Sequence, residues 1–284
     1  MMKYQLIVDS CCELTEDLKE SLHAISIPLK MLIGDDEYVD DENLDIENFL
    51  NVLKDVKVLP KSSCPSPGDY ADAFIKSDAD YIFAVTLSSK LSGSYNSAMQ
   101  GKAIAEEAGK KVHIFDSKSA SASELLISLK IKELIESGLN TDEIIAKTDE
   151  FIQGSKIFFV LEKNDNLVKN GRMNAFLGKA LAALNIRLIL GSDGDGNIKL
   201  VSKVRGGSAN AISELAQKIA DSSGLTRGQT LVITHCQNPQ AVKALVAKVK
   251  QTCSFKQIII MPTGGLSSMY ADIGGVLAAF WSEL

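Results

Sequence analysis

Two hydroxyl-rich segments contain the residue types best suited to hold a ligand. The first is Lys61–Tyr70, which reads Lys-Ser-Ser-Cys-Pro-Ser-Pro-Gly-Asp-Tyr, and the second is Thr86–Asn96, which reads Thr-Leu-Ser-Ser-Lys-Leu-Ser-Gly-Ser-Tyr-Asn. Each lies where we expect a helix to begin, so serine hydroxyls would stand beside free backbone N–H groups at a positive helix end. Two such ends meeting in one crevice would bind a carboxylate or a phosphate without a metal.

The cysteines and histidines do not form a metal-binding pattern. Among the five cysteines, Cys11 and Cys12 are adjacent and the others are isolated, so no Cys-x-x-Cys spacing exists. The three histidines are far apart in the sequence. We therefore expect reduced thiols, no metal and no cofactor.

The composition is that of an ordinary globular protein. With 284 residues, the chain is long enough for two domains, and 45% of its residues are hydrophobic while 23% are charged. The net charge of −6 argues against a nucleic-acid partner, which needs a basic face. We find no apolar stretch of membrane-spanning length and no start resembling a signal peptide, so we expect a cytoplasmic location.

The first half of the chain alternates strand-like and helix-like segments. Three short apolar runs, Tyr4–Val8, Tyr81–Leu87 and Val112–Phe115, are each followed by a polar loop and a helical pattern. This order predicts a parallel sheet covered by helices, in which ligands bind at the carboxyl ends of the strands. The remaining segments are a strand over Ile25–Ile33 with Pro28 at an edge or bulge, and helices starting near Thr15, over Ile46–Leu53, at Pro67, over Ser94–Ala108 and through Ser137.

The second half predicts a mixed α/β unit with some antiparallel pairing. We place a boundary near Gly154, which gives an N-terminal domain over residues 1–155 and a C-terminal domain over residues 156–284. The turn Ser192–Asn197 is rich in Gly and Asp and indicates a hairpin. The other segments are strands over Ile157–Val160, Ile186–Leu190, Ile198–Val201, Leu231–Thr234 and Gln257–Met261, helices over Asn174–Leu184, Ala209–Asp221 and Gln240–Lys250, a Gly/Ser segment over Thr263–Ser268, and apolar Gly275–Trp281.

Seven short motifs occur in an order that resembles a known family. They are Asp9-Ser10, Ser62-Ser63-Cys64-Pro65-Ser66-Pro67, Leu91-Ser92-Gly93-Ser94-Tyr95, Phe115-Asp116-Ser117, Asn170-Gly171-Arg172, Leu184-Asn185-Ile186 and Lys203-Val204-Arg205. Together they resemble the DegV family, the fatty-acid-binding subunits of bacterial fatty acid kinase. The resemblance covers essentially the whole chain.

The resemblance implies a two-domain α/β protein of DegV-like (EDD) architecture that encloses one long-chain fatty acid. The acyl tail would lie in an apolar tunnel, for which Phe176–Leu190 and Val276–Trp281 are candidate linings. The carboxylate would lie at the domain junction. By position, the residues that would hold the carboxylate are Ser62, Ser63, Ser92, Gly93 and Ser94. An ATP-dependent kinase subunit would convert the bound acid to an acyl phosphate, for delivery to an acyltransferase or a membrane surface.

One segment departs from the family pattern. Many members carry a His-x-Gly-Pro-Gly segment near the C-terminus, whose histidine adds a donor at the head group, whereas the corresponding Met261–Asp272 contains no histidine. Thr263, Ser267 and Tyr270 are the candidate replacements.

Two arginines are candidates for a phosphate or a partner surface. Arg172 follows a Gly turn and is equally consistent with a solvated surface charge, while we interpret Arg205 as a docking residue for a partner.

The serines also have a purely structural interpretation. Ser62 and Ser63 could simply form turns before Pro65, and Ser92-Gly93-Ser94 could simply cap a helix. Two other functions stay open: a sensor of another small anionic metabolite, and a Ser-dependent hydrolase. The sequence lacks both the Gly-x-Ser-x-Gly elbow and the phosphate loop Gly-x₄-Gly-Lys-Ser/Thr, so we favour a binding protein that is not itself an enzyme.

Overall fold

A four-stranded parallel sheet forms the first layer of the computed structural model, in which residues 3–174, 186–222, 224 and 226–283 are described. Its strands run in the order β2-β1-β6-β7. Their bounds are β1 Tyr4–Asp9, β2 Ala24–Ile27, β6 Tyr81–Thr86 and β7 Val112–Asp116. The polar segments that follow β1, β6 and β7 therefore meet at one edge of the sheet, as the sequence predicts.

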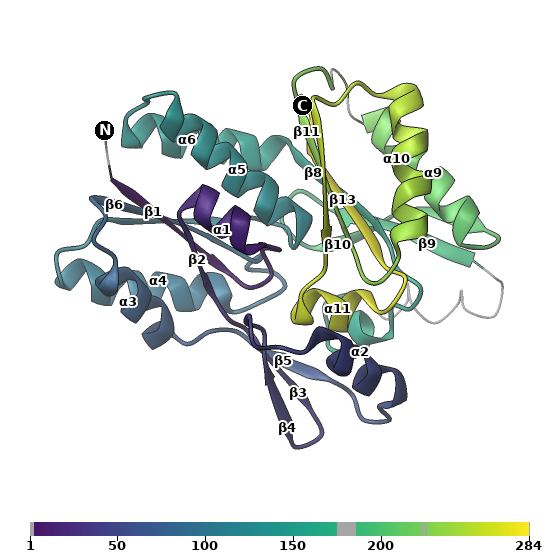
Figure 1. Cartoon of the computed structure of the whole chain (residues 1–284), viewed down its shortest axis with the longest axis horizontal. Coiled ribbons are helices and arrows are strands. Elements are labelled where there is room, and N and C mark those ends of the chain that lie inside the picture. Colours follow the sequence, from purple (N-terminus) through teal and green to yellow (C-terminus); the bar gives the residue numbers. More distant parts are fainter. Residues whose placement is uncertain (1–2, 175–185, 223, 225, 284) are drawn as a thin grey trace.

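Helices cover both faces of this sheet because successive side chains of a strand point to opposite sides. On β1, Ile7 packs with Tyr70 of one helical layer, while Leu6 and Val8 pack with the other. The first layer contains α3 (Pro67–Lys76) and α4 (Ser94–Glu107); the second contains α1 (Glu16–Leu22), α5 (Ala122–Glu136) and α6 (Thr141–Gly154) (Figure 1).

A six-stranded mixed sheet forms the second half of the molecule. Its order is β10-β9-β8-β13-β11-β12, antiparallel throughout except for the parallel pair β11–β12. The helix α5 packs against strands of both sheets and so lies between them. The bounds are β8 Ser155–Val160, β9 Ile186–Ser192, β10 Ile198–Arg205, β11 Thr230–His235, β12 Gln257–Pro262 and β13 Val276–Trp281, with α9 (Ser208–Ser222) and α10 (Pro239–Thr252) on the outer face.

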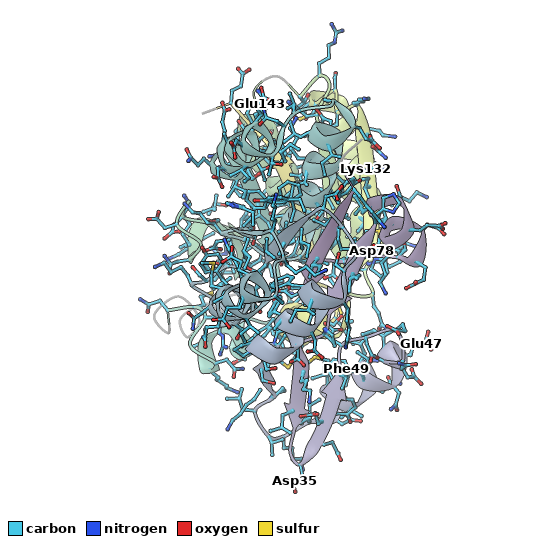
Figure 2. All side chains as sticks on the ribbon, turned by 90° about the vertical axis from the view of Figure 1, so that its left-hand side faces the viewer. Asp35, Glu47, Phe49, Asp78, Lys132 and Glu143 are labelled. Atoms are coloured by element: carbon cyan, nitrogen blue, oxygen red, sulfur yellow. The ribbon has the colours of Figure 1, made fainter. Side chains whose placement is uncertain are left out.

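A small antiparallel sheet of order β4-β3-β5 stands apart from the other two. Figure 2 shows its β3–β4 hairpin projecting from the molecule with Asp35 at the tip. The C-terminal helix α11 packs against β3 and against α2, although they come from opposite ends of the chain. The bounds are β3 Lys30–Ile33, β4 Asp36–Val39, β5 Lys61–Ser63, α2 Ile46–Asp55, α7 Asp165–Lys169 and α11 Gly265–Ala271.

The predicted fold class is confirmed: a helix-covered parallel sheet is followed by a second α/β unit with antiparallel pairing. The hairpin at Ser192–Asn197 is also confirmed, since it joins antiparallel β9 and β10. The division into residues 1–155 and 156–284 stays a prediction; the six-stranded sheet begins at Ser155. No helix in the described ranges is long and apolar enough to cross a membrane.

Three local predictions differ from the structure. Ile25–Ile33 is not one strand: β2 ends at Ile27 and β3 begins at Lys30 in another sheet, because Pro28 lacks the N–H that would continue the ladder. Lys61–Ser63 belongs to a segment that we expected to be a loop, but it forms a strand. The Gly/Ser segment Thr263–Ser268 is largely helical, because α11 begins at Gly265. The helix predicted over Asn174–Leu184 lies outside the described residues except for Asn174.

Candidate functional site

A cavity of about 290 Å³ is lined by strands of the small sheet and of the six-stranded sheet, and by the segments that follow β1, β6 and β7 of the parallel sheet. One wall is apolar and comes from the six-stranded sheet, with Ile157 and Phe159 on β8, Ile198 on β10 and Leu277 on β13. Because side chains alternate along β8, Phe158 and Val160 point the other way and pack with α9. The strand β8 therefore supplies the cavity wall on one face and a helix-covered core on the other.

Hydroxyl groups and a guanidinium group gather at one end of this cavity. The Ser62 and Tyr270 hydroxyl oxygens lie 2.9 Å apart and join β5 to α11. The Arg172 guanidinium lies 5.9 Å from the centre of the Tyr270 ring and donates from Nε to the Leu91 carbonyl at 3.1 Å. These contacts place Arg172 beside the turn that leads into α4.

The structure brings most of the predicted site residues together. Ser62, Ser63, Ser92, Gly93, Arg172, Ser267 and Tyr270 all line the cavity. Ser94, Thr263 and Arg205 are not among the lining residues. The buried Thr263 hydroxyl lies 2.7 Å from that of Ser268, and Arg205 is exposed at the end of β10.

The first segment opens a helix at Pro67, as predicted, but Ser66 and Pro67 are not among the residues that line the cavity. Ser62 and Ser63 line the cavity without belonging to this helix start. They belong to β5, where Ser62 pairs with Met31 and Ser63 pairs with Lys30, so successive side chains point to opposite faces of the small sheet. The helix α3 starts later and is capped by Ser66, whose hydroxyl accepts from the Asp69 N–H at 3.2 Å.

Of the two predicted segments, the second brings a helix start to the cavity, that of α4. Its N-cap is Gly93, which has no side chain to cap the helix. A Cβ at Gly93 would lie 2.9 Å from the Cys64 sulfur, so the residue that follows β5 packs closely against this turn. The Ser92 hydroxyl accepts from the Ser94 N–H at 3.2 Å and lies 3.0 Å from the Ser94 hydroxyl. Ser94 therefore supports Ser92 from the buried side.

Buried carboxyl groups lie behind this turn. The Asp9 carboxyl accepts from the backbone N–H groups of Leu87 at 2.9 Å and Cys11 at 3.1 Å. Burial raises the pKa of Asp9 to about 6, although these hydrogen bonds oppose the change. Burial and then the charge of Asp9 raise the pKa of Glu124 well above its ordinary value.

Two further acids fix the helix that carries Tyr270 and Ser267. Asp40 accepts from the backbone N–H groups of Gly265 at 2.6 Å and Leu266 at 3.1 Å. Glu13 accepts from the Gly264 N–H at 2.6 Å and from the Ser121 hydroxyl at 2.9 Å. Burial raises the pKa of Glu13 to about 8. The N-terminus of α11 is thus occupied by the protein's own carboxyl groups and is closed to an anionic ligand.

The cavity lining contains a second cation, Lys118, which the sequence patterns did not predict as a site residue. It follows β7 and adopts the left-handed backbone conformation with φ of 50°. The one signal in the sequence was its place after Asp116-Ser117, at the carboxyl end of a parallel strand. The acids Glu13 and Asp40 were missed as well, because their partners lie more than two hundred positions away.

The arrangement suits an amphiphilic anion. An apolar wall can cover a hydrocarbon chain, and hydroxyl and guanidinium donors at one end can hold a carboxylate. The candidate tunnel segment Phe176–Leu190 and the motif Leu184-Asn185-Ile186 lie outside the described residues except from Ile186 onward, where β9 begins.

Comparison with known proteins gives consistent matches over the full length. A family model described as "Uncharacterised protein, DegV family" matches residues 3–283. A DegV domain-containing protein of Streptococcus pneumoniae is 33% identical over 283 residues, covering 98% of this chain and 99% of its own length.

Two solved structures are similar as well. A DegV family protein from Ruminococcus gnavus, solved with vaccenic acid, superposes with a TM-score of 0.93 at 36% identity, covering 98% of this chain and 100% of its own. The fatty acid kinase (Fak) B3 protein of Streptococcus pneumoniae, loaded with linoleic acid, gives a TM-score of 0.90 at 32% identity, covering 99% and 100%.

Proposed function

The chain belongs to the DegV family, and on that premise we propose that it binds one long-chain fatty acid in this cavity and presents it to a kinase. The observation that carries the proposal is the combination of an apolar wall from β8 and β13 with the hydroxyl and guanidinium groups at one end. The similar protein from Ruminococcus gnavus was solved with a fatty acid, which supports the same ligand class here.

In the proposed complex the carboxylate lies between β5, the start of α4 and α11. Ser62, Ser92 and the Gly93 N–H donate to it, with Arg172 and Tyr270 completing the set, while Ser94 supports Ser92. Ser63 lines the cavity, but its side chain points to the opposite face of β5 from that of Ser62. Each charge-assisted hydrogen bond contributes roughly 1.5–3 kcal/mol, and each buried CH₂ contributes about 0.8 kcal/mol. Over a long chain the tail therefore supplies most of the affinity, and the head group sets its orientation.

The similarity to the Streptococcus pneumoniae Fak B3 protein supports a kinase partner. In the proposed reaction a carboxylate oxygen bonds to the γ-phosphorus of ATP held by the partner. The bond from that phosphorus to the β,γ-bridging oxygen breaks, and ADP leaves. The binding protein then releases the acyl phosphate to an acyltransferase or at a membrane surface. In this scheme the chain has no turnover of its own.

Native mass spectrometry of the purified protein, with gas chromatography of its extracted ligand, tests the proposal. We expect one fatty acid per chain, and rebinding of added fatty acid after delipidation. A protein that carries a polar metabolite instead would support the sensor function. Hydrolysis of acyl esters by the isolated protein, lost in Ser92→Ala, would support the hydrolase.

A further inference from the structure

One turn connects the two cationic residues of the cavity. The turn is Ser88–Ser92, in which the backbone N–H groups of Leu91 and Ser92 both donate to the Ser88 carbonyl, at 2.9 and 3.0 Å. On one side Leu91 accepts from Arg172. On the other side the Ser88 N–H donates to the carbonyl of Ser119, the neighbour of Lys118, at 2.9 Å. Ser92 is therefore flanked by Arg172 and by the Lys118 segment.

The backbone of Lys118 is held in place from two sides. Its N–H donates to the Asp116 carboxylate at 2.9 Å, and its carbonyl accepts from the Ser192 hydroxyl at 3.3 Å. A Cβ at Gly196 would come within 3.3 Å of the Lys118 Cα, so the β9–β10 hairpin rests directly on this residue. The left-handed backbone of a lysine costs free energy, and such conformations concentrate at binding sites.

Within the described ranges, Lys118 forms no salt bridge. Eleven salt bridges join described side chains, and neither Lys118 nor Arg172 takes part in any of them. These two residues are also the cations that line the cavity in the described part of the chain. The cavity thus offers two positive charges in a protein whose net charge is −6.

A fatty acid carboxylate needs only one of these charges. It carries one negative charge, which the charge of Arg172 can match, whereas a terminal phosphate carries about two at neutral pH. Lysine binds phosphate as a compact point charge with three donors. We propose that Lys118 forms a phosphate subsite beside Ser92, which retains the acyl phosphate after phosphoryl transfer. This inference rests on the proposed function and assigns it a product-holding residue.

The test compares two ligands of equal chain length on delipidated protein. Tridecanoic acid has a carboxylate head on a dodecyl group, and dodecylphosphonic acid is a stable analogue with a phosphate-like head on the same group. Calorimetric titration gives the ratio of their affinities. We expect Lys118→Met, which keeps an unbranched side chain one atom shorter and removes the charge, to lower the phosphonate-to-carboxylate ratio roughly tenfold. Lys118→Arg keeps the charge and should largely retain the ratio.

The matched control is Lys111→Met, because Lys111 is exposed at the opposite end of the same strand, β7. It should leave the ratio unchanged. If Lys118→Met does not fold, Lys118→Asn makes the same test with a residue that tolerates the left-handed backbone. An unchanged ratio in the charge-removing variant, Lys118→Met or its substitute Lys118→Asn, or an equal fall in Lys111→Met, would overturn the subsite. A wild-type protein that binds neither ligand would instead contradict the proposed function.

Discussion

The hydroxyl oxygens of Ser62 and Tyr270 lie 2.9 Å apart although 208 positions separate them in the chain. Ser62 belongs to the three-residue strand β5 and Tyr270 to the short helix α11, and both line the cavity. This contact links the small sheet to α11 beside the polar groups of the site.

Removing the Tyr270 hydroxyl should loosen this end of the cavity. We expect Tyr270→Phe to lower the free energy of unfolding by about 0.5–1.5 kcal/mol, the net contribution of one hydrogen bond, and to weaken fatty acid binding. Urea titration and ligand titration measure the two effects. Tyr38→Phe is the control. Tyr38 belongs to β4 of the small sheet, its ring packs on Phe49 of α2, and it does not line the cavity. Equal binding losses in both variants would contradict a role for Tyr270 at the head group.

Ser92→Ala should weaken fatty acid binding roughly tenfold or more, because a donor to a charged group is lost. Unfolding should stay cooperative. The matched substitution is Ser97→Ala, one turn further along α4, where the hydroxyl contacts Cys64 and lies outside the cavity lining. Tight binding by Ser92→Ala would remove this serine from the carboxylate site.

Substitutions of two adjacent phenylalanines on β8 can distinguish an effect on the bound ligand from an effect on the stability of the fold. Phe159 faces the cavity and Phe158 faces the outer core beneath α9. We expect Phe159→Leu and Phe158→Leu to destabilise the fold to a similar extent, since both remove buried ring atoms. Only Phe159→Leu should change the preferred chain length of the bound acid, as read by gas chromatography. A shift in both variants would mean that the tail does not lie against β8.

Stability should fall as the pH rises, and Glu13 should account for part of the fall. Its pKa is about 8 in the folded protein against an ordinary value of 4.5, so the folded state binds this proton more tightly than the unfolded state. The free energy of unfolding therefore decreases between about pH 4.5 and 8.

Glu13→Gln removes the carboxyl group that titrates. It should therefore reduce the difference in the free energy of unfolding between pH 5 and pH 8, as urea titrations at the two pH values would show. The exposed Glu20→Gln is the control and should leave the difference as in the wild type. A steeper pH dependence in Glu13→Gln would contradict the raised pKa.

Arg205 stands apart from the cavity and is the candidate contact for a kinase. We expect Arg205→Ala to leave fatty acid binding intact and to reduce phosphorylation of the bound acid by a partner kinase, measured as acyl phosphate formed. Lys199→Ala, exposed at the other end of the β9–β10 pair, controls for the loss of one positive charge. Unchanged phosphorylation in Arg205→Ala would contradict a role for Arg205 in docking the kinase.

The parts of the fold that sequence patterns predict are those fixed by local interactions. The apolar run Tyr81–Thr86, the proline that opens α3 and the Gly/Asp turn before Ile198 each leave a signal within a few residues. The parallel sheet follows from their order, and so does the edge at which the polar loops meet.

The parts that sequence patterns miss depend on distant partners. The helix α11 begins in a Gly-Gly sequence with little helical tendency, and it forms where Glu13 and Asp40 accept its first N–H groups. The three residues of β5 form a strand only because β3 lies alongside them. The role of Lys118 in the lining likewise depends on the hairpin that packs over it.

The interlocking of α11 with the first quarter of the chain also determines when the site can be assembled. Its bonds to Glu13 and Asp40 span 251 and 225 positions. Contacts of such long range form late and slow the folding of a domain. A chain emerging from the ribosome lacks this wall of the cavity until Gly265–Ala271 have been made. The cavity therefore cannot enclose a ligand before α11 has been made and has reached Glu13 and Asp40.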